Sequence, residues 1–343
     1  MGMTMPATTM LRTIAVALML AAFGDSVAAA QDDDFYKGKT ITIVVGYSAG
    51  GGYDQYARTF ARYFTHHLNG NPTVLVQNMP GAATLTSVRY LDATAPKDGT
   101  VITMFDPGLI TESFAAPETF KIKFSDYRWI GSMLRDIRVC YAWGATGVKT
   151  WADLMTRKEF LIGATSRGAN AYVNGAILRK ILHAPVRQIP GYAGSNEQRL
   201  AVERGELEGA CASWSSIPQE WIADHKINAL VRFSPERPAD MPETIPYVAD
   251  LVTTKEQKDL LAILGASGEL GRPLIVSRAV PIGHAQMLRA AFEATMNDLG
   301  FKADAERQSL PLDLVTGAEA EKIVEQIYTA SPDLAKQVED VLK

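Results

Sequence analysis

Residues 40–58, TITIVVGYSAGGGYDQYAR, decide the fold of this chain. The run 40–45 is short, apolar and β-branched, which predicts a buried strand. After the glycines, apolar residues recur at spacings of three to four, which predicts a helix over 53–68. A buried strand that leads through a glycine loop into a helix is typical of an α/β domain. The apolar face of the predicted helix consists of Tyr53, Ala57, Phe60, Phe64 and Leu68.

Two more strands extend this first unit. The run 73–77 (TVLVQ) predicts a second strand, residues 85–93 a helix, and 100–105 (TVITMF) a third strand. The order strand, helix, strand, helix, strand predicts a parallel sheet with right-handed crossovers.

A second alternating series begins after Trp129, and the proline-rich run 234–246 ends it. A Ser195-x-x-Gln198 capping box is expected to start its last helix. The expected strands lie near 139–143, 160–163, 186–189, 207–212 and 229–233, and the expected helices around 151–157, 169–182 and 196–204.

The C-terminal part is expected to be helical over 285–299, 317–328 and 332–342. The second of these helices follows a Thr316-x-x-Glu319 capping box, and Pro332 occupies a first-turn position that tolerates proline. We expect this tail to return and pack on the first unit. The fold class is therefore predicted as α/β, with two doubly wound domains and a helical C-terminal segment.

The first 30 residues have the features of a cleavable secretory signal peptide. Arg12 precedes the apolar run 14–23, which is too short to span a bilayer, and Ala28-Ala29-Ala30 supplies a small-residue cleavage pattern. We therefore expect a mature chain from Gln31, soluble in the periplasm. The rest of the composition is ordinary, with 47% hydrophobic and 21% charged residues, and the net charge of −4 gives no footprint for nucleic acid.

Cys140 and Cys211 are the only cysteines. In an oxidising compartment they could form a disulfide, or they could remain two buried thiols. The sequence does not show whether they are close enough to pair.

Residues 46–50 also match G-x-S-x-G, the nucleophile-elbow pattern of α/β-hydrolases, with Ser48 as the nucleophile. Such an enzyme needs a histidine after the serine and the acid, and His284 is the only late histidine. No HGGG-type segment supplies an oxyanion hole, and no sheet precedes the first strand. The alternative is that Gly50, Gly51 and Gly52 form a backbone cradle for an anion at a helix N-terminus.

Nucleotide and metal sites are disfavoured by spacing. The glycines are not followed by the Lys-Ser/Thr pair that a phosphate-binding P-loop requires. In the dinucleotide-binding pattern G-x-G-x-x-G, the position of the third glycine is occupied by Gln55. His66 and His67 are adjacent, so on a helix they point in different directions. We expect no cofactor and no metal.

The same strand-to-helix device recurs at 78–87 (NMPGAATLTS), 164–171 (ATSRGANA) and 191–198 (GYAGSNEQ). In doubly wound sheets such loops lie at the carboxyl ends of the strands, where ligands bind. Each loop alone could be purely structural. Four small-residue loops from two units that face each other predict a binding cleft.

Four segments carry a resemblance to a known family: FYKGKTITIVVGYSAGGGYDQYAR, NMPGA, APKDGT and GYAGSNEQRLAVERGELEGA. They resemble the solute receptors of tripartite tricarboxylate transporters, also called the Bordetella uptake gene (Bug, TctC-like) family. The resemblance covers about 35–343. It implies a type II periplasmic binding protein, with a discontinuous domain 1 (31–136 and 234–343), domain 2 (137–233), and a two-strand hinge. It also implies binding of organic acids without catalysis, and large and small integral membrane subunits as partners.

Carried over onto this chain, the family's binding loops correspond to 47–54, 81–83, 165–170 and 192–195. This chain departs from the family pattern at Ala49, at Arg167 and at Tyr172, which stands where a histidine is common. The candidate ligand-binding residues are Tyr47, Ser48, Ala49, Gly50, Gly51, Gly52, Tyr53, Asp54, Gly81, Ala82, Ala83, Asp106, Thr165, Ser166, Arg167, Gly168, Asn170, Tyr192, Ala193, Gly194, Ser213 and Trp214.

Two of these residues have specific expected roles. The planar guanidinium of Arg167 is expected to hold a second ligand carboxylate, unless Arg167 is exposed or paired with a structural acid. Trp214 and Tyr192 either stack on an unsaturated or aromatic acid or serve as core aromatics. The predicted function is that of a monomeric periplasmic receptor for a small carboxylate, such as a dicarboxylate or aromatic acid, that serves a tripartite transporter. The alternatives are a Ser48 hydrolase and a solute sensor for a signalling membrane protein.

Overall fold

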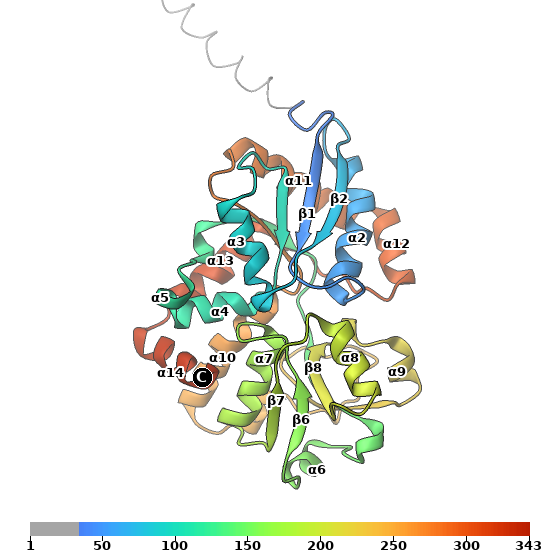
Figure 1. Cartoon of the computed structure of the whole chain (residues 1–343), viewed down its shortest axis with the longest axis vertical. Coiled ribbons are helices and arrows are strands. Elements are labelled where there is room, and N and C mark those ends of the chain that lie inside the picture. Colours follow the sequence, from blue (N-terminus) through green and yellow to red (C-terminus); the bar gives the residue numbers. More distant parts are fainter. Residues whose placement is uncertain (1–33) are drawn as a thin grey trace, which may run out of the picture.

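The computed structural model describes residues 34–343, so the predicted signal peptide and its cleavage at Gln31 lie outside the described residues. Two α/β domains lie one above the other, each built on its own sheet (Figure 1). The strands are β1 (Thr40–Val45), β2 (Thr73–Asn78), β3 (Val101–Met104), β4 (Arg128–Ser132), β5 (Arg138–Trp143), β6 (Phe160–Gly163), β7 (Val186–Ile189), β8 (Gly209–Ser213), β9 (Ile227–Arg232), β10 (Pro273–Val276) and β11 (Val315–Thr316).

The helices follow the predicted order closely, and α3, α13 and α14 have the predicted bounds. They are α2 (Gly52–Phe64), α3 (Leu85–Ala93), α4 (Gly108–Ala115), α5 (Pro117–Phe120), α6 (Trp151–Met155), α7 (Asn170–Ala176, continued by a π-helical turn over Ile177–Ile181), α8 (Ser195–Glu203), α9 (Gln219–Ala223), α10 (Lys255–Ala266), α11 (Ile282–Asn297), α12 (Leu299–Arg307), α13 (Gly317–Tyr328) and α14 (Pro332–Leu342). Within residues 34–343, no helix has both the length and the apolar content needed to cross a membrane.

The first sheet has the strand order β11-β4-β10-β3-β1-β2. β1 pairs in parallel with both β2 and β3, as predicted from the alternating pattern. β10 pairs antiparallel with β3, and β4 and β11 continue that edge with antiparallel pairings. Segments from the C-terminal third of the chain therefore complete the first sheet.

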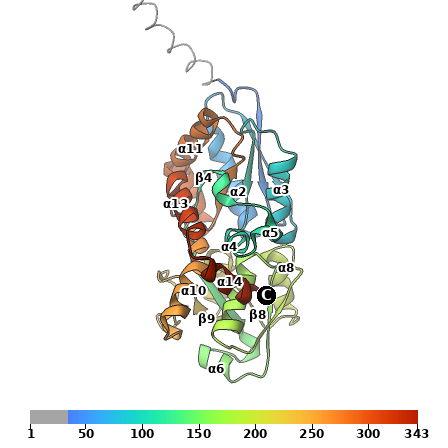
Figure 2. The same ribbon diagram turned by 90° about the vertical axis from the view of Figure 1, so that its left-hand side faces the viewer.

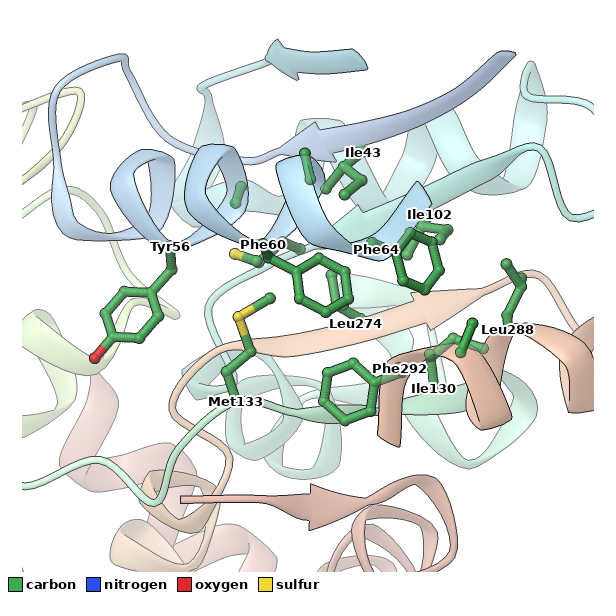
Figure 3. Close-up of a cluster of buried hydrophobic side chains, with 14 of the residues drawn as sticks. Ile43, Tyr56, Phe60, Phe64, Ile102, Ile130, Met133, Leu274, Leu288 and Phe292 are labelled. Atoms are coloured by element: carbon green, nitrogen blue, oxygen red, sulfur yellow. The ribbon is translucent and has the colours of Figure 1, made fainter. Parts of the chain in front are cut away.

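Helices cover both faces of the first sheet. On one face, Phe60 and Phe64 of α2 lie against Leu274 of β10 and Phe292 of α11 (Figure 3). On the other face, Trp129 packs in a cluster with residues of α3, α4 and α13. The apolar stripe predicted for α2 is thus the face that it buries.

The second sheet has the order β7-β6-β8-β5-β9, with β6 parallel to β7 and β8, and with β5 antiparallel to β8 and β9. α8 and α9 cover one face, and α7, α10 and α14 the other. Cys140 of β5 lies directly opposite Cys211 of β8, and the two form a disulfide with a Cα–Cα distance of 4.0 Å. The structure therefore selects the disulfide from the two alternatives that the sequence left open.

The chain crosses between the sheets twice, from β4 to β5 through 133–137 and from β9 to β10 through 233–272. α11, α12 and α13 pack on the first sheet, as predicted for the tail. α14 packs against both domains: Val338, Val341 and Leu342 are buried in the cluster of the second sheet, next to α7 and α10, and the helix also contacts α4 of the first domain. Figures 1 and 2 show α14 and α10 beside each other at the junction of the two domains.

The two predicted capping boxes have different outcomes. Thr316 and Glu319 form the predicted box at the start of α13. The box at Ser195 is wrong, because Ser195 is already the first residue of α8 and Gly194 is its N-cap, without a side-chain cap. A Cβ at Gly194 would lie 2.6 Å from the Oγ of Ser48, so contact with the first domain explains the glycine there.

Candidate functional site

The glycine loop between β1 and α2 lies against the second domain. Gly50 has φ +80°, in the region that favours glycine. A Cβ at Gly51 would lie 3.1 Å from the Oγ of Ser195, and one at Gly52 would lie 2.2 Å from the Oγ of Ser216. Both serines belong to the second domain, so these two glycines let the domains approach closely.

The N-terminal end of α2 already holds a carboxylate of the chain itself. Asp54 accepts hydrogen bonds from the backbone N–H of Gly50 at 2.9 Å, from Arg58 Nε at 2.9 Å and from Asn78 Nδ2 at 3.0 Å. Burial works against the charge, but the bonds from Arg58 and Gly50 outweigh it and lower the pKa of Asp54. The anion cradle predicted at this loop is therefore partly filled by Asp54.

A cavity of about 60 Å³ lies between the domains beside this loop. At ~10–15 Å³ per water, it has room for about four to six waters, which is the size of a small organic acid. We refer to it as the inner cavity. It is lined by Tyr47, Gly51, Gly52, Tyr53, Asp106, Arg138, Tyr141, Thr165, Ala171, Ser195, Gln198, Arg199, Ala210, Cys211, Ala212, Ser213, Ser216 and Ile217.

Arg138, which lines the inner cavity, belongs to a cluster of three buried charges. Arg138 Nη1 is 3.0 Å from Asp136 Oδ2, and Arg272 Nη1 is 3.7 Å from the same oxygen. Burial opposes the charge of Arg272, but the Asp136 carboxylate outweighs it and raises the pKa of Arg272. Two guanidinium groups thus share the Asp136 carboxylate, and the buried Asp106 carboxylate also acts on both of them.

The three charges are tied to the second domain by serine hydroxyls. Ser213 donates to Asp136, and Arg272 Nη2 donates to Ser216 Oγ at 3.0 Å. Arg272 also lies over the ring of Tyr53, 4.4 Å from its centroid. The charge cluster therefore connects the crossing segment, β10 and both domains.

Several polar groups on the inner cavity have no partner within residues 34–343. They are Arg138 Nε, the hydroxyl of Tyr53 and the hydroxyl of Thr165, all of which are buried. A buried polar atom without a hydrogen-bond partner destabilises the folded state. Native proteins therefore rarely keep such an atom unless a water, ion or ligand supplies the missing hydrogen bond. These groups are therefore available to a bound molecule.

Asp106 forms part of the inner cavity on the side of the first domain and is 2% exposed. It accepts from the Tyr47 hydroxyl at 2.5 Å and from the backbone N–H groups of Gly108 at 2.8 Å and Asn170 at 3.0 Å. Burial raises the pKa of Asp106, although Arg138 and these donors act against that shift. Because Asn170 begins α7, Asp106 also joins the two domains.

A second, larger cavity of about 390 Å³ shares Tyr47 and Thr165 with the inner one, and we refer to it as the outer cavity. Its first-domain wall is the loop before α3, where Ala82, Ala83 and Thr84 have φ values of 45°, 53° and 73°. Each non-glycine residue in this region costs roughly 1–3 kcal/mol, and such strain is concentrated at functional sites. The outer cavity is lined by Gly46, Tyr47, Pro80, Gly81, Ala82, Ala83, Thr84, Thr165, Ser166, Gly191, Tyr192 and Ala193.

The structure divides the sequence-predicted residues into three groups. Those on the inner cavity are Tyr47, Gly51, Gly52, Tyr53, Asp106, Thr165 and Ser213. Those on the outer cavity are Gly81, Ala82, Ala83, Ser166, Tyr192 and Ala193, with Tyr47 and Thr165 shared. The other predicted residues are not among those that line these two cavities: Ser48, Ala49, Gly50, Asp54, Arg167, Gly168, Asn170, Gly194 and Trp214.

For Arg167 and Trp214, the structure shows the structural alternative that the sequence left open. Arg167 is about half exposed, and its Nε lies 3.6 Å from Oε1 of the buried Glu112, which is the structural pairing left open above. Trp214 donates its Nε1–H to Asp240 at 3.0 Å and belongs to the core of the second sheet.

Sequence reasoning missed Arg138, Arg199 and Arg272. Arg138 begins a buried strand (RVCYAW), and Arg272 directly precedes another (PLIV). A charged residue that enters an otherwise apolar run was the available signal, because strands of this kind are rarely charged unless the charge has a partner.

Ser48 lacks the surroundings of a catalytic nucleophile. Its hydroxyl donates to Glu197 Oε2 at 2.9 Å. The His284 ring stacks on Phe35, and its Nδ1 lies 2.7 Å from the carbonyl of Asp98. None of the hydrogen bonds in the described part of the chain joins Ser48 to a histidine, and no group of His, Cys, Asp and Glu there could hold a metal ion.

Comparisons with known proteins give the fold. No protein-family model and no curated protein matches the chain. Among solved structures, the periplasmic binding protein BugD is similar, with a TM-score of 0.70 and 18% identity over 89% of this chain and 98% of that one. The chain has the fold of the Bug/TctC periplasmic binding proteins.

Two other structures with this fold were solved with carboxylates. MatC from Rhodopseudomonas palustris with bound malate has a TM-score of 0.69 and 16% identity, over 89% of this chain and 99% of that one. A second R. palustris protein with adipate has a TM-score of 0.70 and 15% identity, over 88% and 97%.

Proposed function

We propose that this protein is a periplasmic receptor that captures a small organic anion in the inner cavity. The observation that carries the proposal is the buried guanidinium of Arg138 on that cavity, whose Nε has no partner within residues 34–343. The malate and adipate bound to proteins of the same fold support a carboxylate as the anion.

Arg138 takes the role that the sequence gave to Arg167. Its guanidinium lines the inner cavity and keeps Nε without a partner in the described structure, so it has a donor left for a carboxylate. The hydroxyls of Tyr53 and Thr165 supply further hydrogen bonds to the same ligand. Because all three groups are buried, their bonds to the ligand form away from water, where they are strongest.

Ligand capture couples to closure of the two domains about the crossing segments. Ser48 to Glu197 and Asp106 to the N–H of Asn170 are contacts of the closed form that join first-domain to second-domain residues. A ligand held by both domains adds to these contacts and shifts the population toward the closed form. The receptor performs no chemistry on its ligand and acts as a monomer.

We propose delivery of the ligand to the large and small integral membrane subunits of a tripartite tricarboxylate-type transporter. The domain division proposed from the sequence, 31–136 with 234–343 against 137–233, provides the hinge for this cycle. A receptor that presents its loaded form to a signalling membrane protein would use the same site, and the partner alone distinguishes the two.

The test is a thermal-shift panel on the chain from Gln31, with monocarboxylates, dicarboxylates, tricarboxylates, aromatic acids, sugars and cations. A ligand at 100 times its Kd should stabilise the folded protein by about 2.7 kcal/mol. Arg138→Gln should abolish the shift by organic anions. The matched control is Arg135→Gln on the same segment, since Arg135 is partly exposed and pairs with Glu269. Stabilisation by sugars or cations alone, with no organic anion active, would contradict the proposal.

A further inference from the structure

The inner cavity presents a negative group as well as positive ones. Asp106 lines it together with Arg138 and Arg199, and burial keeps all three from bulk water to a large extent. A ligand that carried only a carboxylate would balance Arg138 but would place its own charge in the same small volume as the Asp106 carboxylate. Like charges at short range and low dielectric repel strongly.

Asp106 has one acceptor position left. An ionised carboxylate offers about four lone-pair sites. Three of them are taken by the Tyr47 hydroxyl and by the N–H groups of Gly108 and Asn170. No fourth donor to Asp106 is found among the hydrogen bonds of residues 34–343. A ligand with a hydrogen-bond donor near its carboxylate would fill this position.

We propose that the receptor selects small acids that carry a hydroxyl or ammonium group close to the carboxylate, and that Asp106 determines this selection. In the complex, Arg138 holds the carboxylate and Asp106 accepts from the hydroxyl or ammonium. The inner cavity of about 60 Å³ suits a small hydroxy or amino acid. This inference rests on the proposed function and names the substrate class of the same site.

The selectivity follows from unpaired groups rather than from added contacts. An acid without the donor leaves the last acceptor position of Asp106 without a partner and places a second carboxylate beside it. A site built to bond a hydroxyl rejects the analogue that lacks it by large factors, because its buried polar group is left unpaired. We therefore expect a preference of at least about tenfold for the acid with the donor.

The experiment is isothermal titration of the chain from Gln31 with matched pairs: malate and succinate, lactate and propionate, alanine and propionate. The hydroxy acids and the amino acid form separate arms, so they show which donor the site prefers. In the wild-type protein, at least one acid with a donor should bind about tenfold more tightly than its partner. In Asp106→Ala the ratio should fall to about one.

Glu269→Ala is the matched control, because it removes a carboxylate that is exposed and does not line the inner cavity. It should keep the preference for acids with a donor. Equal binding of the paired acids by the wild type, or a preference that survives in Asp106→Ala, would overturn this inference while the proposed function stands. If no acid of either kind binds, the proposed function fails. The wild-type comparison needs no variant, so it decides the inference even if Asp106→Ala does not fold.

Discussion

Gly52→Ala should separate ligand binding from folding. The Cβ of the alanine would lie 2.2 Å from the Oγ of Ser216 and 3.3 Å from Nη2 of Arg272. Non-bonded carbon contacts normally lie near ~3.5–4.0 Å, so Ser216 and the alanine cannot keep their positions together. Gly52 is the first residue of α2, where alanine suits the helix at least as well as glycine. The closer of the two conflicts, with Ser216, therefore arises where the second domain lies against the first.

Overpacking of this kind costs about 1–3 kcal/mol, and a factor of ten in Kd corresponds to about 1.4 kcal/mol. If the closed form bears that cost, Kd should rise by about 5- to 150-fold. The free protein should unfold within about 1 kcal/mol of the wild type. Both quantities can be measured, by isothermal titration with the most stabilising acid and by chemical denaturation without ligand.

Gly51→Ala is the matched control for this experiment. Its Cβ would lie 3.1 Å from Ser195 Oγ, which is the end of a side chain that can rotate away. We expect its Kd to stay within a few-fold of the wild type. An unchanged Kd in Gly52→Ala would refute the reasoning that the two domains must close on this glycine to bind.

Three further predictions concern stability. The double variant Cys140→Ser with Cys211→Ser, which removes the disulfide, should lower the free energy of unfolding by about 4 kcal/mol, from the loop-entropy relation for a separation of 71 residues. Denaturation with urea measures this loss, and equal stability with and without the disulfide would contradict the prediction. Thr316→Ala should cost about 1 kcal/mol because it removes the cap of α13, whereas Thr316→Ser should retain most of the stability in the same assay. The hydrogen bond from Arg62 lowers the pKa of Asp304 to about 2. This pair therefore stabilises the fold above pH ~4, and the stabilisation is lost as pH falls toward 2. Arg62→Gln should flatten that part of the acid-denaturation curve, and an unaltered curve would exclude the pair as a source of acid sensitivity.

The periodicity of apolar residues along the sequence predicted those helices and strands whose own residues show such a pattern. β1 and α2 are a buried strand and an amphipathic helix, and each has the periodicity of its class. α4 escaped prediction because all eight of its residues are buried, so it has no polar face and no helical period. β10 has only four residues and follows a long segment without regular alternation. These elements depend on what the rest of the chain packs around them.

The site was predictable where it consists of loops and not where it depends on distant partners. Tyr47, Thr165 and the loop 81–83 follow strands, so a strand-to-helix pattern identified them. The role of Arg138 depends on Arg272, which reaches it through the strand β10 that the sequence analysis did not find. Arg167 faces Glu112 of the unpredicted α4 for the same reason. A local window shows that Arg138 is a charged residue in an apolar run, but it does not show which partner that charge meets.

A structure of the protein with a bound organic acid would test the central claim most directly. Our account predicts the acid in the inner cavity, with its carboxylate within hydrogen-bond distance of the Arg138 guanidinium and with the Tyr53 and Thr165 hydroxyls directed at it. An acid bound elsewhere, with Arg138 still facing only Asp136, would contradict the account.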